Sequence, residues 1–62
     1  MKRRKLLGDI TRHAKSINAQ LTLKEGGAHT IVRLGDRQTV VPHHTEINEI
    51  TARQIMKQLG MK

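Results

Sequence analysis

The spacing of the apolar residues changes near Asn18, and this change divides the chain into a helical part and a strand-forming part. Before Asn18, apolar side chains recur three and four residues apart, which places them on one side of a helix. The members of this apolar stripe are Leu6, Leu7, Ile10, Ala14 and Ile17. After Asn18, Leu21 and Leu23 alternate with polar residues, as they do in a strand. The sequence therefore predicts an amphipathic helix over about residues 2–16, followed by a first strand.

Two further strands follow the segment "EGG", which interrupts the first one. The runs "HTIVRL" and "QTVVP" are rich in β-branched residues, which favour strands. Between them, Gly35 and Asp36 can close a tight hairpin, because Gly accepts a positive φ at the first central position and Asp tolerates one at the second. Pro42 has no N–H to donate to a ladder, so we expect the third strand to end there.

A second helix is predicted near the end of the chain, after the loop "HHTEINE". Asn48 is a suitable N-cap, and Gly60 suits the left-handed position that follows a helix. The apolar face of this helix consists of Ala52, Ile55, Met56 and Leu59. Ile50 falls outside that face, so either it packs against a different neighbour or the helix begins nearer Thr51.

The order helix, three strands, helix predicts an α+β fold. Its simplest form is a three-stranded antiparallel sheet with both helices covering one face. In the second strand, Val32 and Leu34 would then point to the helices. The other face of the sheet would be open and would carry His29, Ile31 and Arg33.

The net charge of +7 and the pI near 11 favour a polyanionic partner. Residues 1–24 hold seven basic residues and one acidic residue, whereas residues 25–62 hold five and four. The basic face of the first helix consists of Arg4, Lys5, Arg12 and Lys15. This face is either an ordinary solvated surface or a phosphate-binding one, and the shortage of acidic residues on it favours phosphate binding. We expect the polyanion to be nucleic acid.

The length of 62 residues predicts a single domain over residues 1–62 with a shallow surface site, which suits a polymer better than an enclosed small molecule. The apolar stretch after "KRRK" is too short for a secretory signal, and no stretch is long enough for a membrane span. We therefore take the cytoplasm as the default location and expect no membrane partner. The absence of cysteine is compatible with a reducing compartment but does not prove it.

The residue types present disfavour several kinds of chemistry. The carboxylates are scattered over different elements, which disfavours a metal-dependent nuclease. They are Asp9, Glu25, Asp36, Glu46 and Glu49. His43 and His44 are adjacent, and neighbours in sequence rarely bind one ion, so we expect a loop pair and no metal site. The lack of cysteine and of aromatic residues disfavours nucleophilic thiol chemistry and base-stacking platforms.

His29 remains as a group that can exchange protons near neutral pH. RNA suits such a group, because its 2′-hydroxyl is an internal nucleophile that a proton acceptor can activate without a metal. Gly26 and Gly27 beside it would admit a bulky backbone, and their N–H groups could bind phosphate. On these features alone two interpretations stay open: His29 is the proton-transfer residue of a ribonuclease, or an ordinary surface residue at a strand end.

The ordered pattern along the chain resembles the HicA family of small bacterial toxins, also described as YcfA-like mRNA interferases. Its parts are a basic leading helix, Gly-x-x-His over Gly26–His29, a Val-Pro-x-His segment over Val41–His44, and an Ile-x-x-Gln-x-Gly run over Ile55–Gly60. The resemblance implies an α-β-β-β-α fold like that of a double-stranded-RNA-binding domain. It also implies cleavage of mRNA that stops translation, without a cofactor, and a HicB-type antitoxin that masks the site.

By this resemblance His29 takes the catalytic role. We expect Lys24, Arg33 and Arg37 to lie near it as phosphate stabilisers. The expected RNA-binding set also contains Arg4, Lys5, Arg12, Lys15, Gly26 and Gly27. The residue after Pro42 is often basic in the family and is His43 here, so a phosphate contact at that position would depend on pH. His44 is either a loop residue bonded to backbone or a contact for substrate or antitoxin.

The sequence thus predicts a metal-independent endoribonuclease toxin whose oligomeric state is set mainly by its complex with the antitoxin. Two other functions are considered beside it. A non-catalytic RNA-binding module of the same fold would bind RNA in a salt-sensitive way without forming product. A membrane-active peptide would require the first helix to release its apolar face from the core.

Overall fold

The computed structural model describes residues 1–61, and its five elements follow the predicted order. They are α1 (Arg3–Ser16), β1 (Leu21–Glu25), β2 (His29–Leu34), β3 (Arg37–Pro42) and α2 (Glu49–Gln58). The strands form one sheet in the order β1-β2-β3, and both pairs are antiparallel. The predicted α+β meander, like that of a double-stranded-RNA-binding domain, is confirmed.

Tight turns join the three strands and fix their register. Gly35 has a φ of +60°, which a glycine adopts readily, and the turn it forms with Asp36 places Leu34 opposite Arg37. At the other end of β2, the Gly26 N–H donates to the carbonyl oxygen of His29 over 2.8 Å. Because both turns are short, each side chain of β2 has a defined neighbour on either side.

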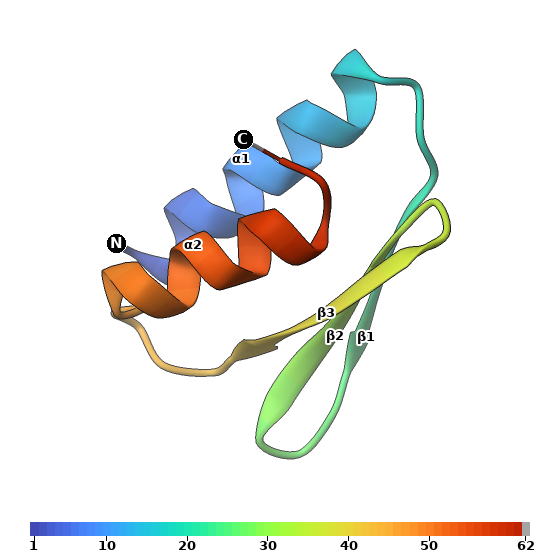
Figure 1. Ribbon diagram of the computed structural model, residues 1–62. Coiled ribbons are helices and arrows are strands. Elements are labelled where there is room, and N and C mark those ends of the chain that lie inside the picture. The colour runs from blue at the N-terminus through green and yellow to red at the C-terminus, as the bar shows by residue number, and fades with distance from the viewer. Residues whose placement is uncertain (62) are drawn as a thin grey trace.

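Both helices lie on the same side of the sheet, so the molecule has two layers (Figure 1). The core between the layers consists of Leu6, Ile10, Ala14, Val32, Leu34, Val41, Ile47, Ala52, Ile55 and Leu59. Val32 and Leu34 point into it as predicted, and so does Thr30. Ile17 was predicted to belong to the apolar stripe, but its side chain is 52% exposed. The reason is that α1 ends at Ser16, so Ile17 lies beyond the last helical turn.

The ends of α2 agree with the prediction, although its first turn does not. The Asn48 side chain accepts a hydrogen bond from the Ile50 N–H over 2.8 Å, and Gly60 has a φ of +77°. The helix begins at Glu49, and Ile50 is 68% exposed in its first turn. Ile50 therefore neither packs against another neighbour nor marks a start nearer Thr51.

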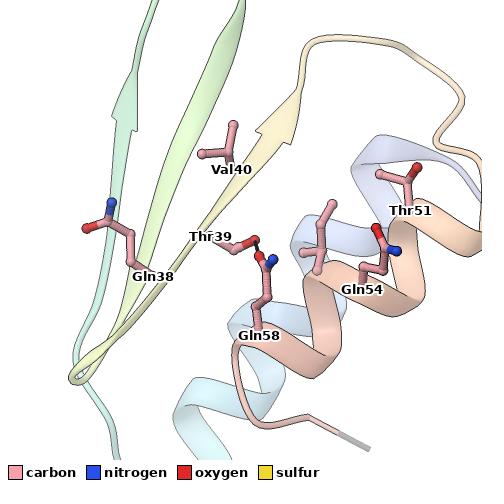
Figure 2. Close-up of a pocket in the computed structure, with 7 residues that line it drawn as sticks. Gln38, Thr39, Val40, Thr51, Gln54 and Gln58 are labelled. Atoms are coloured by element: carbon pink, nitrogen blue, oxygen red, sulfur yellow. Dashed lines mark hydrogen bonds between the residues drawn. The ribbon is translucent and has the colours of Figure 1, made fainter.

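A buried hydroxyl links α2 to β3. The Thr39 hydroxyl lies on the helix-facing side of β3 and donates to the amide oxygen of Gln58, as Figure 2 shows. A buried polar group needs such a partner, so this contact compensates for placing Thr39 in the core. Gln58 is the glutamine of the Ile-x-x-Gln-x-Gly run, and this bond gives it a structural role.

The start of α1 is joined to the linker between β3 and α2. Lys2 and Glu46 form an isolated antiparallel bridge, and the Arg3 N–H donates to the Thr45 carbonyl oxygen over 2.9 Å. These contacts place the first turn of α1 beside the end of β3. Within residues 1–61, no helix combines the length and the apolar character needed to cross a membrane.

Candidate functional site

His29 is the first residue of β2, and its side chain lies on the face of the sheet that the helices leave open. It is exposed, Pro42 lies directly across from it on β3, and its carbonyl accepts from Gly26, the residue after β1. Its imidazole makes no hydrogen bond to another residue of the described chain 1–61. Both ring nitrogens are therefore available to a bound molecule.

Gly26 keeps one side of this imidazole clear. A Cβ atom at Gly26 would lie 3.0 Å from the His29 carbonyl oxygen and 3.9 Å from the ring atoms Cδ2 and Nε2. A side chain at position 26 would therefore press on the backbone and stand beside Nε2. At Gly27, by contrast, a Cβ atom would meet nothing within 4 Å. The free space beside the ring thus depends on Gly26 and not on Gly27.

Two of the expected phosphate-stabilising residues share the open face with His29. Lys24 pairs with Ile31 and is a diagonal neighbour of His29, at about 7–8 Å between Cα atoms, a separation that a lysine side chain can span. Arg33 lies four residues further along β2, about 13 Å away. A shallow cavity of about 310 Å³ lies between these two cations, with Thr22 and Gln38 on its rim. His29, Lys24 and Arg33 thus form one continuous surface.

Arg37 lies elsewhere, at the other end of the sheet. It pairs with Leu34, so the register places it about 17 Å from His29 along the strands and on the helix side. Its guanidinium packs at Gly60, where a Cβ atom would be 3.0 Å from Arg37 Nε. The expectation that Arg37 lies near His29 is therefore not met.

The basic residues of α1 form a separate surface. Arg4, Lys5, Arg12 and Lys15 are all exposed on α1, in the layer behind the sheet as seen from His29. Asp9 lies 3.6 Å from Lys5 Nζ and also contacts Arg12, so the one acidic residue of α1 partly compensates two of these charges. Apart from Arg37, the expected RNA-binding residues therefore fall on two surfaces, one on the open face of the sheet and one on α1.

A polar network that the sequence analysis did not predict lies at the same end of the sheet as His29. Arg3 Nη2 donates to the Thr30 hydroxyl (2.6 Å), and Arg3 Nε donates to the Pro42 carbonyl oxygen (3.0 Å). Glu25 Oε1 accepts from the Thr30 hydroxyl (2.9 Å) and lies 2.7 Å from His43 Nε2. The network therefore joins α1 to all three strands. The one signal that could have predicted part of this network is the register of β1 against β2, which places Glu25 directly opposite Thr30.

The network keeps Glu25 charged and orients His43. The hydrogen bond from Thr30, followed by that from His43, lowers the pKa of the Glu25 carboxyl below its ordinary value. His43 Nε2 thus lies within hydrogen-bond distance of both Glu25 Oε1 and the Thr30 hydroxyl (3.0 Å). Among residues 1–61, no group of three or more histidine, aspartate or glutamate side chains could hold a metal ion.

A groove of about 370 Å³ between β3 and α2 has a different character (Figure 2). The residues that line it are Gln38, Thr39, Val40, Thr51, Gln54, Ile55 and Gln58. None of them carries a charge, so this groove offers no cation to a phosphate backbone. The surfaces suited to a polyanion are the open face of the sheet and the start of α1.

Comparison with known proteins supports a family assignment. The sequence model of a family described as the HicA toxin of bacterial toxin-antitoxin systems matches residues 8–61. No curated protein and no solved structure matches the chain. The family match takes in nearly all of the sequence, including β1, the turn at Gly26 and His29. The chain therefore belongs to the HicA toxin family.

Proposed function

We propose that this toxin is a metal-independent endoribonuclease that cleaves mRNA in the cytoplasm, with His29 as general acid or base. The observation that carries the proposal is the exposed, unbonded imidazole of His29 beside Gly26, on a sheet face that also presents Lys24 and Arg33. In a member of a toxin family, this arrangement supplies proton transfer and cations together on a surface open to a polymer.

The chemistry of RNA explains why so few groups are needed. The 2′-oxygen attacks the neighbouring phosphorus as its proton leaves, and the bond to the 5′-oxygen breaks as that oxygen gains a proton. The products are a 2′,3′-cyclic phosphate and a free 5′-hydroxyl. His29 performs one of the two proton transfers. Lys24, within reach on the neighbouring strand, stabilises the extra negative charge on the phosphoryl oxygens in the transition state, and Arg33 holds the strand further along.

Replacing His29 with Ala tests this proposal. Expression of wild type should arrest growth and degrade RNA, whereas His29→Ala should do neither, because a proton-transfer residue typically contributes ~10²–10⁴-fold. The purified variant should melt at nearly the same temperature as wild type, since the His29 side chain lies outside the core. His13→Ala is the matched control, because His13 lies on α1 away from the open face.

The outcomes separate the candidate functions. A toxic His29→Ala variant, or one with only a two- or threefold loss of cleavage, would refute the catalytic role. Chelation with EDTA should leave cleavage unchanged, and loss of activity would favour a metal mechanism. Salt-sensitive RNA binding without any product would indicate a non-catalytic RNA-binding module. A membrane-active helix is disfavoured because the apolar face of α1, including Leu6 and Ile10, is buried in the core.

A toxin of a toxin–antitoxin pair has a cognate antitoxin. We propose that this partner is of the HicB type and that it covers the open sheet face around His29, with His44 on the adjoining loop as a further contact for partner or substrate. Such a complex would also set the oligomeric state. Co-expression with the neighbouring reading frame should restore growth, and the purified complex should no longer cleave RNA.

A further inference from the structure

We propose that a cavity beside the first turn of α1 binds a second phosphodiester of the RNA strand whose scissile phosphodiester lies at His29. This inference rests on the proposed function and names a further part of the substrate site. The cavity has a volume of about 530 Å³. The residues that line it are Lys2, Arg3, Arg4, His43 and Thr45. None of them is acidic.

Arg3 connects this cavity to His29. Its two hydrogen bonds go to the hydroxyl of Thr30, the residue after His29, and to the carbonyl of Pro42, the residue opposite His29. The Cα atoms of a directly opposed pair lie about 4.5–5.5 Å apart. The cavity and the imidazole therefore lie at the same end of β2 and β3, on opposite faces of the sheet. An RNA strand that lies on the open face and passes this end meets Arg3 next.

The Arg3 guanidinium is fixed in place and still has donors to offer. A guanidinium carries five N–H groups, and the bonds to Thr30 and Pro42 use two of them. Its remaining N–H groups form a fixed planar fork of the kind that binds phosphate oxygens. Because the bonds to the sheet hold the side chain, little rotamer freedom is lost when an anion binds.

The charges around the cavity are not explained by the stability of α1. The first turn of α1 contains no acidic residue, and Arg3, Arg4 and Lys5 lie at the positive end of the helix dipole. Within residues 1–61, Arg3 and Arg4 belong to no ion pair. The two carboxylates nearby are each engaged, Glu46 by Lys2 (3.0 Å) and Glu25 by His43 (2.7 Å). Among the described residues, Arg4 is thus a cation at an unfavourable helix end with no ion-pair partner, which favours an external anion.

Affinity for an RNA strand that cannot be cleaved tests the cavity separately from catalysis. The probe is a fluorescent oligonucleotide of about 12 nucleotides with 2′-O-methyl groups, which lacks the nucleophile. The variants are Arg4→Gln and His43→Gln, measured by anisotropy over a range of salt concentrations. Arg53→Gln is the control, because Arg53 is an exposed cation on α2, outside the cavity.

We expect Arg4→Gln to weaken binding about 3- to 10-fold. It should also reduce the salt slope by about 0.7, the value for one phosphate of a single strand that the protein no longer neutralises. His43→Gln should also weaken binding, whereas Arg53→Gln should bind as wild type does. In cleavage of a long RNA, Arg4→Gln should raise KM and leave kcat within about twofold. With a dinucleotide, whose single phosphodiester occupies only the His29 site, Arg4→Gln should have no effect.

Three results would overturn the inference. Equal affinities for wild type and both cavity variants would indicate that these cations do not bind RNA and serve an acidic segment of a protein partner instead. An equal loss in Arg53→Gln would show that only the overall charge matters. If inorganic phosphate competes as well as RNA does at an equal concentration of phosphate groups, the cavity is a site for a free anion. That result would also count against an RNA strand. Retained cleavage by His29→Ala would refute the proposed function, while the binding experiment would still decide whether the cavity holds RNA.

Discussion

Replacing Gly26 with Ala should slow RNA cleavage much more than replacing Gly27. The new Cβ would lie 3.0 Å from the His29 carbonyl oxygen, whereas ordinary contacts begin at 3.4 Å, so the two strand ends must separate by about 0.4 Å. If a displacement of 1 Å costs about 10²-fold, a shift of this size costs about 6-fold. The methyl group would also lie near the Nε2 atom of His29, so we expect a total loss in kcat/KM of about 10-fold.

Gly27→Ala provides the matched control in the same turn. Its Cβ would meet nothing within 4 Å, and Gly27 does not have a positive φ. Alanine there should keep activity and should stabilise the fold by about 0.4–1 kcal/mol, because the unfolded chain loses freedom. Gly26→Ala should lose stability, since the turn between β1 and β2 must open.

The assay is cleavage of a fluorescent RNA by the two purified variants, together with their thermal melts. Activity of Gly26→Ala equal to that of Gly27→Ala would refute the argument that space beside the imidazole limits the reaction. A large loss of activity in Gly27→Ala would indicate that the turn itself must flex. Since the two variants are expected to differ in stability, their activities are compared at a temperature at which the thermal melts show both to be folded.

Two further predictions concern stability. The pKa of the Glu25 carboxyl is lowered from 4.5 by its hydrogen bonds with Thr30 and His43, so its stabilising effect is present above that value and is lost as the pH falls through the lowered pKa. The melting temperature of wild type should therefore exceed that of Glu25→Gln at pH 6, and the difference should shrink below pH ~4; a difference that stays constant would refute the assignment. Ile55→Ala should cost about 2–5 kcal/mol, because Ile55 is 3% exposed in the core, and circular dichroism should show a largely unfolded chain. Ile50→Ala, at a residue 68% exposed, should stay within about 0.5 kcal/mol of wild type.

The local signals in the sequence were sufficient for the elements and their order. The helical spacing before Asn18, the Gly35–Asp36 turn and the Asn48 cap each depend on residues within a few positions of one another, and all three are present in the structure. Alternation also assigned the faces of β2 correctly. It was less informative for β1, where Leu23 points to the helix side but is 47% exposed, because β1 is an edge strand.

The site could be predicted only where one strand determined it. The place of His29 follows from the alternation of β2 alone. The place of Arg37 depends on the register of β3 against β2, which puts it opposite the buried Leu34 and away from His29. The network of Arg3 and Glu25 depends on contacts between α1 and the sheet, which no spacing along the chain encodes. Proximity in sequence therefore identified Lys24 and Arg33, which share the open face with His29, but failed for Arg37.

The arrangement of β2 also determines which substitutions are informative. His29, Ile31 and Arg33 alternate with the buried Thr30, Val32 and Leu34, so the open face can be altered without disturbing the core. Arg3 lacks this separation, because it lines the cavity and also binds the buried Thr30 hydroxyl. Loss of activity in Arg3→Ala would therefore mix a binding effect with an unsatisfied polar group in the core. Arg4 lines the same cavity without such a bond, so Arg4→Gln reports on anion binding alone.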